Sequence, residues 1–408
     1  FVCFVLFLST WFPCPPDNGA KIRAYYLIRA LARRHEVSAV ALCPSGGGGE
    51  EDINIESAAV YPVHDDPFRY VGLPTFLKFV SPIPLAYWPS RMMKEKVRKV
   101  AQSDRWDAVV CLKPPVAQYA RFVDAPRLLD VDTSLAYQMY ERYEGSRGSL
   151  SRWRAWASWR KAYHWEKRLF QRFRACTVVS PKEAPAIEEM VRGSGCRVAV
   201  VPNGVDCERN RPNSYPRRPN TLVYNGALTY SANYDAMHYF LEVIFPLIKG
   251  QLPDASLTIT GSTQGVELAG LRLDDGVHLS GYVADIRPVV GGASACVVPL
   301  RQGGGTRIKI LEAMALGTPV VSTTKGAEGL EVVDGEHLLL ADDPHHFAEA
   351  TVRLLQDDAL RQRLAANARR LIEARYDWAA IGARFVGLVE EVVGCPPTRR
   401  QGMTARER

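Results

Sequence analysis

Short runs of apolar residues alternate along most of the chain with longer stretches in which apolar positions recur every three or four residues. The short runs predict strands and the periodic stretches predict helices. In the first half we expect strands at 1–8, 36–43, 58–62, 107–112, 127–131, 175–179 and 197–201, and helices at 20–34, 90–101, 115–122, 150–173 and 182–192. In the second half we expect strands at 221–226, 255–260, 277–280, 294–298, 318–321 and 337–340, and helices at 234–249, 306–316, 344–356, 358–375 and 378–394. Strands that alternate with helices form parallel sheets with right-handed crossovers, so the pattern predicts an α/β fold.

A polar segment rich in Pro and Asn, residues 207–220, interrupts this alternation and is typical of a linker. The chain of 408 residues is also longer than a single hydrophobic core usually supports. We therefore expect one Rossmann-like domain at 1–206 and a second at 221–377. A helix at 378–394 and a flexible basic tail at 395–408 would follow.

The most informative segment is a glycine-rich loop that follows the predicted strand 294–298. It contains Gly304, Gly305, Thr306 and Arg307 and leads into the predicted helix 306–316. Thr is a good helix-capping residue, and the N–H groups at a helix N-terminus favour an anion such as phosphate. Ligands of open α/β sheets bind at the carboxyl ends of the strands, which is where this loop is expected.

Two charged residues of the predicted helix fit the same kind of ligand. Lys309 adds a mobile positive charge one turn into the helix, and Glu312 lies on nearly the same face three residues later. The loop amides, Lys309 and Arg307 suit a diphosphate, and the Glu312 carboxylate suits the hydroxyl groups of a ribose. The alternative is that the glycines form a flexible turn and that Lys309 and Glu312 are an ordinary pair on a helix surface.

Five segments of the second half resemble, in order and spacing, the nucleotide-sugar-binding domain of retaining glycosyltransferases with the GT-B fold, specifically glycosyltransferase family 4. These segments are VPNGVD at 201–206, LVYNGAL at 222–228, LTITG at 257–261, GYVADI at 281–286 and the glycine-rich segment 303–322. Residues 15–23 and 33–37 resemble the sugar transferases of bacterial exopolysaccharide clusters. The resemblance implies two Rossmann-like domains that face each other across a cleft. The first would bind the acceptor and the second the nucleotide sugar, and the helix 378–394 would cross back to the first.

The resemblance further implies substrate-binding roles for Gly19, Asn225, Gly226, Tyr282 and Val283. Gly19 lies where the family has two adjacent glycines near the donor diphosphate or the acceptor, although the second glycine is Ala20 here. Tyr282 and Val283 correspond to the loop that lines the nucleotide base. The alternatives are a plain strand-to-helix turn at Gly19, and a turn at the edge of the core or packing between the domains at Tyr282.

Asp132 follows the predicted strand 127–131, where relatives often carry a His-Asp pair near the transferred sugar. We expect it, with Lys309, to be catalytic, and a role in helix capping is the alternative. Two family features are absent. The Arg and Lys that many members carry after the segment 225–228 are missing at 229–235, and the residue eight positions before Glu312 is Gly304 instead of the first Glu of a Glu-x7-Glu motif.

The amino-acid composition indicates which kinds of partner and which cellular compartment to expect. The net charge of +7 is moderate and does not favour a nucleic-acid-binding protein. Nine cysteines without CxxC spacing argue against a disulfide framework and a zinc site, and fit a reducing cytosol. The glycine-rich loop has no Asp-x-Asp, so we expect no metal and no cofactor besides the nucleotide-sugar donor. No stretch reaches the roughly twenty apolar residues of a membrane-spanning helix.

The predicted helix 150–173 is the candidate for contact with a membrane. Trp156, Trp159, Tyr163 and Phe170 fall within a narrow arc when they are placed at helical angles. Basic residues surround this arc: Arg152, Arg160, Lys161, Lys167, Arg168 and Arg172. A basic and aromatic face can lie on an anionic lipid surface, which would make the protein peripheral at the inner face of the cytoplasmic membrane. The alternative is that the aromatic side chains belong to the core.

These features predict transfer of a hexosyl unit from a nucleotide-diphosphate sugar to a hydroxyl group of a lipid-linked glycan, with retention, in cell-surface polysaccharide synthesis. Two alternatives stay open: a non-catalytic nucleotide-sugar-binding scaffold of a polysaccharide assembly complex, and a GT-B nucleotide-sugar epimerase. A dinucleotide-dependent oxidoreductase is disfavoured because no G-x-G-x-x-G follows the first strand.

Overall fold

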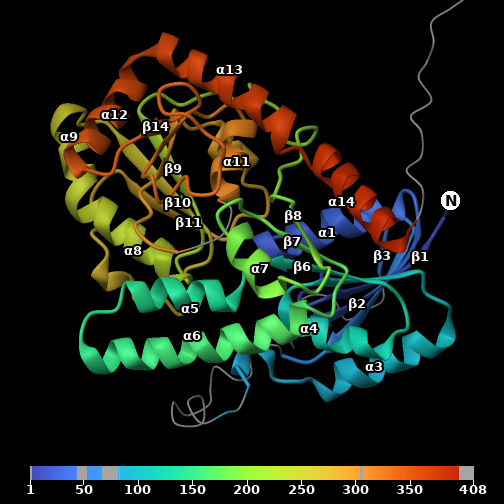
Figure 1. Ribbon diagram of the computed structural model, residues 1–408. Helices are drawn as coiled ribbons and strands as arrows, with labels where there is room; N and C mark the ends of the chain where they lie inside the picture. The colour runs from blue at the N-terminus through green and yellow to red at the C-terminus, as the bar shows by residue number, and fades with distance from the viewer. Residues whose placement is uncertain (1, 44–52, 67–80, 82, 304–306, 395–408) are drawn as a thin grey trace, which may run out of the picture. The chain divides into compact units, whose positions relative to one another are not determined.

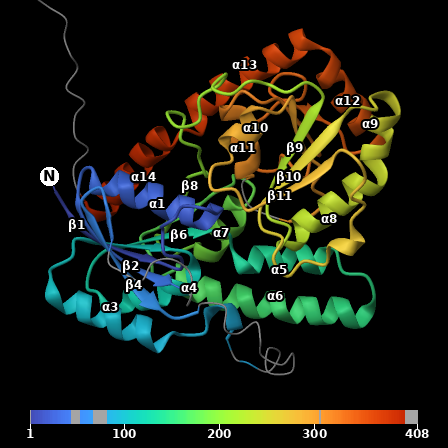
Figure 2. The ribbon, with the colours of Figure 1, turned by 180° about the vertical axis from the view of Figure 1, so that it is seen from behind.

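The structure is a computed structural model that describes residues 2–43, 53–66, 81, 83–303 and 307–394 (Figure 1; the reverse side is in Figure 2). The chain forms two compact units. The first contains the chain up to Val178, then Glu183–Val201, and the chain from Gly382 onward. The second contains Val179–Lys182 and Pro202–Ile381. The predicted tail 395–408 lies outside the described residues.

The first unit is built on an eight-stranded sheet with the strand order β3-β4-β2-β1-β5-β6-β7-β8. The strands are β1 (Phe4–Ser9), β2 (Glu36–Cys43), β3 (Ile53–Ile55), β4 (Ala58–His64), β5 (Ala108–Leu112), β6 (Arg127–Asp132), β7 (Ala175–Val178) and β8 (Arg197–Val200). All described neighbours are parallel except β3 and β4, which are antiparallel. Central strands covered on both faces are continuously apolar, and four consecutive residues of β1, from Val5 to Leu8, are fully buried.

Helices connect these strands and contribute to the core. They are α1 (Gly19–Ala32), α3 (Arg91–Ser103), α4 (Pro114–Ala117), α5 (Leu135–Glu144), α6 (Ser149–Phe170) and α7 (Ala184–Val191). Two short 3-10 segments, Leu85–Tyr87 and Gln118–Phe122, complete the connections. Asn18 caps α1 by accepting a hydrogen bond from the backbone of Lys21, and Ser134 caps α5 in the same way from Tyr137.

The second unit has a six-stranded parallel sheet with the strand order β11-β10-β9-β12-β13-β14. Its strands are β9 (Thr221–Asn225), β10 (Ser256–Thr260), β11 (Val277–Gly281), β12 (Ala295–Val298), β13 (Val320–Ser322) and β14 (Leu339–Leu340). Its helices are α8 (Ser231–Tyr239), α9 (Phe245–Gln251), α10 (Arg287–Gly291), α11 (Ile308–Ala315), α12 (Pro344–Gln356) and α13 (Asp358–Arg375). The last helix, α14 (Trp378–Val393), belongs to the second unit up to Ile381 and to the first from Gly382.

Two sheets of parallel strands alternating with helices confirm the predicted α/β class with two Rossmann-like domains. Some predicted details are wrong. The helix predicted at 234–249 is divided into α8, a π-helical turn at Phe240–Ile244 and α9. Pro246 lies next to this turn, and because proline has no N–H it cannot continue the regular helical ladder. The sequence analysis also missed α5, α10 and β3.

The aromatic face predicted on the helix 150–173 is largely part of the core. Phe170 is fully buried, and Trp159 and Tyr163 pack against the hydrophobic core of the first unit. The reason is the missed helix α5, which lies beside α6 in both views (Figures 1 and 2). Its Tyr143 ring stacks on Trp159 with 5.7 Å between the ring centroids. Of the four predicted aromatic residues, Trp156 is exposed.

Candidate functional site

The carboxyl ends of the strands in the second unit bring three of the predicted site residues together. Asn225 is the last residue of β9, and Lys309 and Glu312 lie on α11. The Asn225 side-chain amide donates a hydrogen bond to the Glu312 carboxylate at 2.9 Å. The predicted pair of charged helix residues therefore faces the end of a strand.

Lys309 is half-buried and held by two polar groups. Its Nζ donates to the Tyr224 hydroxyl at 2.7 Å and to the Asn233 side-chain oxygen at 2.9 Å. The Tyr224 hydroxyl itself donates to the same Asn233 oxygen at 2.7 Å. Neither partner carries a negative charge, so burial dominates and lowers the pKa of Lys309 to about 7. An incoming anion would add a charged partner to these two acceptors, which are the ones that the described residues provide.

Burial also controls the ionisation of Glu312. The hydrogen bond from Asn225 and the nearby positive charge of Lys309 both lower the pKa of Glu312. Desolvation by burial is the larger effect and raises this pKa to about 7. The site thus holds an acid and a base that both titrate near neutral pH. Such perturbed groups, next to each other at the end of a strand, are typical of a binding or catalytic site.

Gly226 has a steric reason to be glycine. A Cβ atom built on it would lie 2.6 Å from the Lys309 Nζ and 3.0 Å from the Asn233 side-chain nitrogen. Real Cβ contacts are longer, so any side chain here would displace Lys309 or Asn233. Gly226 therefore keeps open the space in which the ammonium group lies.

The start of α11 differs from the prediction. Arg307 is not helical and is the N-cap position of a helix that begins at Ile308, whereas the sequence predicted a helix from 306. Arg307 is buried, and its guanidinium donates to the backbone oxygen of Gly303 at 2.6 Å. The amides of Gly304, Gly305 and Thr306, which were predicted to bind phosphate, lie outside the described residues.

Tyr282 and Val283 directly follow β11, which is separated from β9 by β10 in the sheet. Tyr282 is 62% exposed and Val283 is half-buried within the described part of this unit, and their predicted role in lining the nucleotide base stays a prediction. Gly281 before them has a φ of +66°, which an L-residue rarely adopts, and this turn directs the loop away from the strand.

In the first unit, Asp132 lies at the carboxyl end of β6, and Gly19 lies in the connection that leads from β1 into α1. Gly19 is the first residue of α1 after the Asn18 cap. Asp132 ends β6, is 8% exposed and forms an ion pair with Lys113 at 2.8 Å. Both members of this pair have positive φ, +55° at Asp132 and +74° at Lys113. Such strain in non-glycine residues tends to be concentrated at functional sites.

Sequence reasoning missed a second buried carboxyl group near Asp132. Glu183, at the N-cap position of α7, is 3% exposed, and its Oε2 has no hydrogen-bond partner among the described residues. Desolvation and the negative charge of Asp132 raise the pKa of Glu183 to about 8. Because Glu183 and Asp132 are about fifty positions apart in the sequence, no local pattern relates them.

A buried ion pair fixes the backbone around Asp132. Arg23 of α1 contacts Asp130 through two hydrogen bonds of 2.7 and 3.0 Å, and both side chains are fully buried. Arg23 also donates to the backbone oxygen of Val201 at 2.9 Å. The pair links α1, β6 and the end of β8, so it positions the strand end that carries Asp132. No cluster of three or more His, Cys, Asp or Glu residues suited to a metal ion occurs within the described ranges.

The two units correspond to two glycosyltransferase domains. Residues 18–204 match the glycosyl transferase 4-like domain, and residues 219–357 match the family described as glycosyl transferases group 1. Most of the chain is therefore similar, in two consecutive stretches, to glycosyltransferase domains.

Similar proteins include enzymes of lipid and polysaccharide synthesis. A phosphatidyl-myo-inositol mannosyltransferase of Mycobacterium tuberculosis is 30% identical over 214 residues, which cover 49% of this chain and 56% of that protein. The chain thus spans about half the length of the mannosyltransferases it matches. A glycogen synthase of the same species is 24% identical over 406 residues, 92% of each chain.

Solved structures with the GT-B fold superpose on nearly the whole chain. A sucrose-phosphate synthase from Thermosynechococcus elongatus has a TM-score of 0.73 at 18% identity and covers 96% of this chain and 99% of its own. HepE of Anabaena in complex with UDP and glucose has a TM-score of 0.63 at 15% identity and covers 95% of this chain and 100% of its own. At these identities the likeness establishes the fold.

Proposed function

We propose that this chain, most of which is similar to glycosyltransferase domains, transfers a hexosyl unit from a nucleotide-diphosphate sugar to a hydroxyl group, with retention at the anomeric carbon. The observation that carries the proposal is the arrangement of Lys309, Glu312 and Asn225 at the carboxyl end of β9. It combines a cation for the leaving diphosphate with a carboxylate for the ribose hydroxyls. HepE, a structural neighbour, has been solved with UDP and glucose.

Lys309 would supply the main catalytic effect on the donor side. Negative charge develops on the diphosphate as the bond to the sugar breaks, and a fixed ammonium group stabilises that charge in the transition state. Tyr224 and Asn233 hold the ammonium in place before the donor binds. On this proposal the reaction uses no metal ion and no cofactor, and Arg307 and the loop at Gly304–Thr306 assist Lys309.

Asp132 and Glu183 would act in the first unit, on the acceptor. A protonated Glu183 can donate a hydrogen bond to an acceptor oxygen, whereas the Asp132 carboxylate, paired with Lys113, can accept one from a hydroxyl group. Two buried carboxyl groups with different protonation states therefore suit a hydroxyl-bearing acceptor. Gly19, at the start of α1, would leave room for the substrate.

A lipid-linked glycan is the acceptor that the similar proteins favour. Phosphatidyl-myo-inositol mannosyltransferases are among the relatives, and a 44.6 kDa protein from the cps region of Klebsiella pneumoniae is 28% identical over 164 residues. We therefore place the enzyme in cell-surface polysaccharide synthesis, at the inner face of the cytoplasmic membrane. Among the described residues, none of the helices combines the length and hydropathy needed to cross a bilayer.

The test is turnover of donor by the purified protein. UDP-, GDP- and TDP-sugars are each incubated with bacterial lipid extract, and released nucleotide and glycosylated lipid are measured. The Lys309→Ala variant should lose about 2–4 kcal/mol of transition-state stabilisation, or roughly 30- to 1000-fold in kcat/KM. Lys249→Ala is the matched control, because the Lys249 ammonium contacts backbone oxygens of Pro253 and Ala255 before the amino end of β10. Nucleotide binding without turnover of any donor would favour the scaffold alternative.

A further inference from the structure

The second unit contains a cavity of about 1010 Å³ at the opposite edge of its sheet from Lys309 and Glu312. Ser294, which precedes β12, and Gly317, which follows α11, are part of its wall. The segment from Pro212 to Pro219 and one side of α13 complete it. Substrates of open α/β sheets bind at the carboxyl edge, so this cavity is separate from the candidate donor site.

The wall of the cavity is strongly basic. Its described residues include four arginines, Arg217, Arg361, Arg369 and Arg370, but a single acidic residue, Asp358. Asp358 is bound by Arg361, and Arg369 is paired with Glu373 at 2.7 Å. The positive charges of Arg217 and Arg370 therefore remain in excess.

The hydrogen-bond acceptors of these two arginines are uncharged in the part of the chain that the structure describes. Arg217 donates to the backbone oxygen of Gly317, and Arg370 donates to the side-chain oxygen of Asn367 at 2.5 Å. Arg217 is half-buried, and both its burial and the nearby charge of Arg361 lower its pKa. An anion bound beside Arg217 would offset the repulsion from Arg361.

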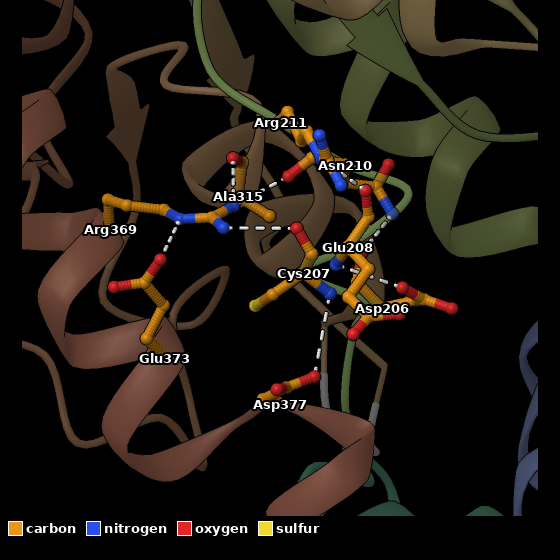
Figure 3. Close-up of polar contacts among 9 residues, drawn as sticks. All are labelled: Asp206, Cys207, Glu208, Asn210, Arg211, Ala315, Arg369, Glu373 and Asp377. Carbon is orange, nitrogen blue, oxygen red and sulfur yellow. Dashed lines mark hydrogen bonds and ion pairs between the residues drawn. The ribbon is translucent and has the colours of Figure 1, made fainter.

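The guanidinium groups deeper in the wall are held in place. Arg369 donates to backbone oxygens of Asn210, Ala315 and Cys207 at 2.5, 2.7 and 3.0 Å, and Figure 3 shows it between α13 and the segment from Asp206 to Arg211. Arg361 donates to the backbone oxygens of Leu354 and Leu355. Side chains that are already ordered lose little entropy when a ligand binds.

We infer that this cavity binds a small organic molecule that carries a phosphate group. Arginine recognises phosphate through paired hydrogen bonds, and Arg217 and Arg370 both line this cavity. The volume exceeds that of phosphate alone and is in the range of sites for small ligands. Four apolar residues of the wall, Pro212, Pro219, Ala365 and Ala366, would contact the organic part. The inference concerns binding alone and does not rest on the proposed transfer reaction.

Phenyl phosphate is a suitable probe, with phenol as the uncharged control, and calorimetry gives the Kd. Wild type should bind phenyl phosphate but not phenol. The variant Arg217→Gln/Arg370→Gln should bind it about tenfold more weakly or worse, the loss expected for one charge-assisted hydrogen bond. Arg363→Gln removes an exposed arginine of α13 that does not line the cavity, so it should bind like wild type.

The variant Lys309→Ala distinguishes binding in this cavity from binding at the candidate donor site, because that site should also attract phosphate. The affinity of this variant for phenyl phosphate should equal that of wild type. Arg370→Gln alone, which changes an exposed residue, should still weaken binding several-fold if the double variant does not fold. The inference is overturned if wild type does not bind the probe, or if Lys309→Ala loses binding while Arg217→Gln/Arg370→Gln retains it.

Discussion

At the scale of single residues, the protonation state of Lys309 should control nucleotide binding. The pKa of Lys309 is lowered to about 7, so the free protein loses this proton as the pH rises above neutrality. A bound diphosphate favours the charged form, and binding above pH 7 must therefore take up a proton. We expect the Kd for UDP to rise between pH 7 and pH 9, by at most tenfold per pH unit.

Lys309→Arg is the control for this pH dependence, because a guanidinium stays charged over the whole range. Glu312 ionises in the same range and contributes an opposite trend if its carboxylate binds ribose. The comparison of wild type with Lys309→Arg isolates the lysine. Equal pH profiles for the two proteins would remove Lys309 from the anion site.

The protonation of Glu183 should instead affect how the stability of the protein depends on pH. The pKa of Glu183 is raised to about 8 in the folded protein, so between pH 4.5 and pH 8 the folded form keeps a proton that the unfolded chain releases. The free energy of unfolding therefore falls as the pH rises through this window, by at most about 1.4 kcal/mol per pH unit, and stops falling above it. Glu183→Gln has no such proton. Its Tm relative to wild type should increase from pH 5 to pH 8.

Glu188→Gln is the matched variant, since Glu188 is exposed on the same helix. Its Tm relative to wild type should stay constant across that range. If the Tm of Glu183→Gln relative to wild type is also constant, the buried carboxyl group is ionised in the folded protein. Glu183 then does not donate a proton to the acceptor.

At the scale of elements, Arg369 joins three segments of the second unit. Its guanidinium binds the last turn of α11 through Ala315, the segment after β8 through Cys207 and Asn210, and Glu373 within α13 (Figure 3). Arg369→Ala would leave several backbone oxygens without a donor, each at a cost of about 1–3 kcal/mol. We expect a loss of roughly 3 kcal/mol or more of stability in denaturant unfolding. Arg370→Ala, the exposed neighbour, should change it by less than about 0.5 kcal/mol.

The helices and strands also show which parts of the fold can be predicted from the sequence alone. Strands of parallel sheets are buried on both faces, which makes runs such as Val5 to Leu8 continuously apolar and easy to predict. α5 was missed although Leu135, Met139 and Tyr143 recur at helical spacing, because the helix is short, at ten residues, and Ala136 is its one buried residue. That omission made the aromatic residues of α6 look exposed.

The candidate site was predictable where its chemistry is local. Lys309 and Glu312 share one helix and follow a glycine-rich loop, so their proximity follows from helical spacing. Their partners Tyr224, Asn233 and Asn225 come from β9 and the start of α8, and only the folded chain brings them to the same place. The roles of all these residues stay predictions until the variants are measured.

At the scale of the whole molecule, we expect the first unit to bind an anionic membrane through exposed residues of α6. Leu150, Trp153 and Trp156 of α6 are 68%, 53% and 43% exposed. They are three residues apart and lie on one side of the helix. Exposed arginines of the same helix surround them: Arg152, Arg154, Arg160 and Arg168. Large apolar side chains with basic neighbours are typical of surfaces that bind lipid.

We expect the protein to sediment with phosphatidylglycerol vesicles and to be released as salt rises. Each basic residue near an anionic surface contributes about 1 kcal/mol, and this attraction is screened over a Debye length. Trp153→Ser/Trp156→Ser and Arg154→Gln/Arg168→Gln should each reduce sedimentation without lowering the Tm, since the replaced side chains are exposed. Lys161 is left unchanged because its Nζ donates to the backbone of Ser81 at 2.7 Å and supports the fold.

The control for this surface is turnover of a water-soluble acceptor, which does not require a membrane. Both sets of variants should keep that turnover, because Lys309 and Glu312 belong to the other unit. A lipid-linked acceptor should be used less efficiently by the same variants. If wild type does not sediment with vesicles at low salt, the exposed tryptophans serve another contact, and the acceptor must reach the enzyme without a lipid surface.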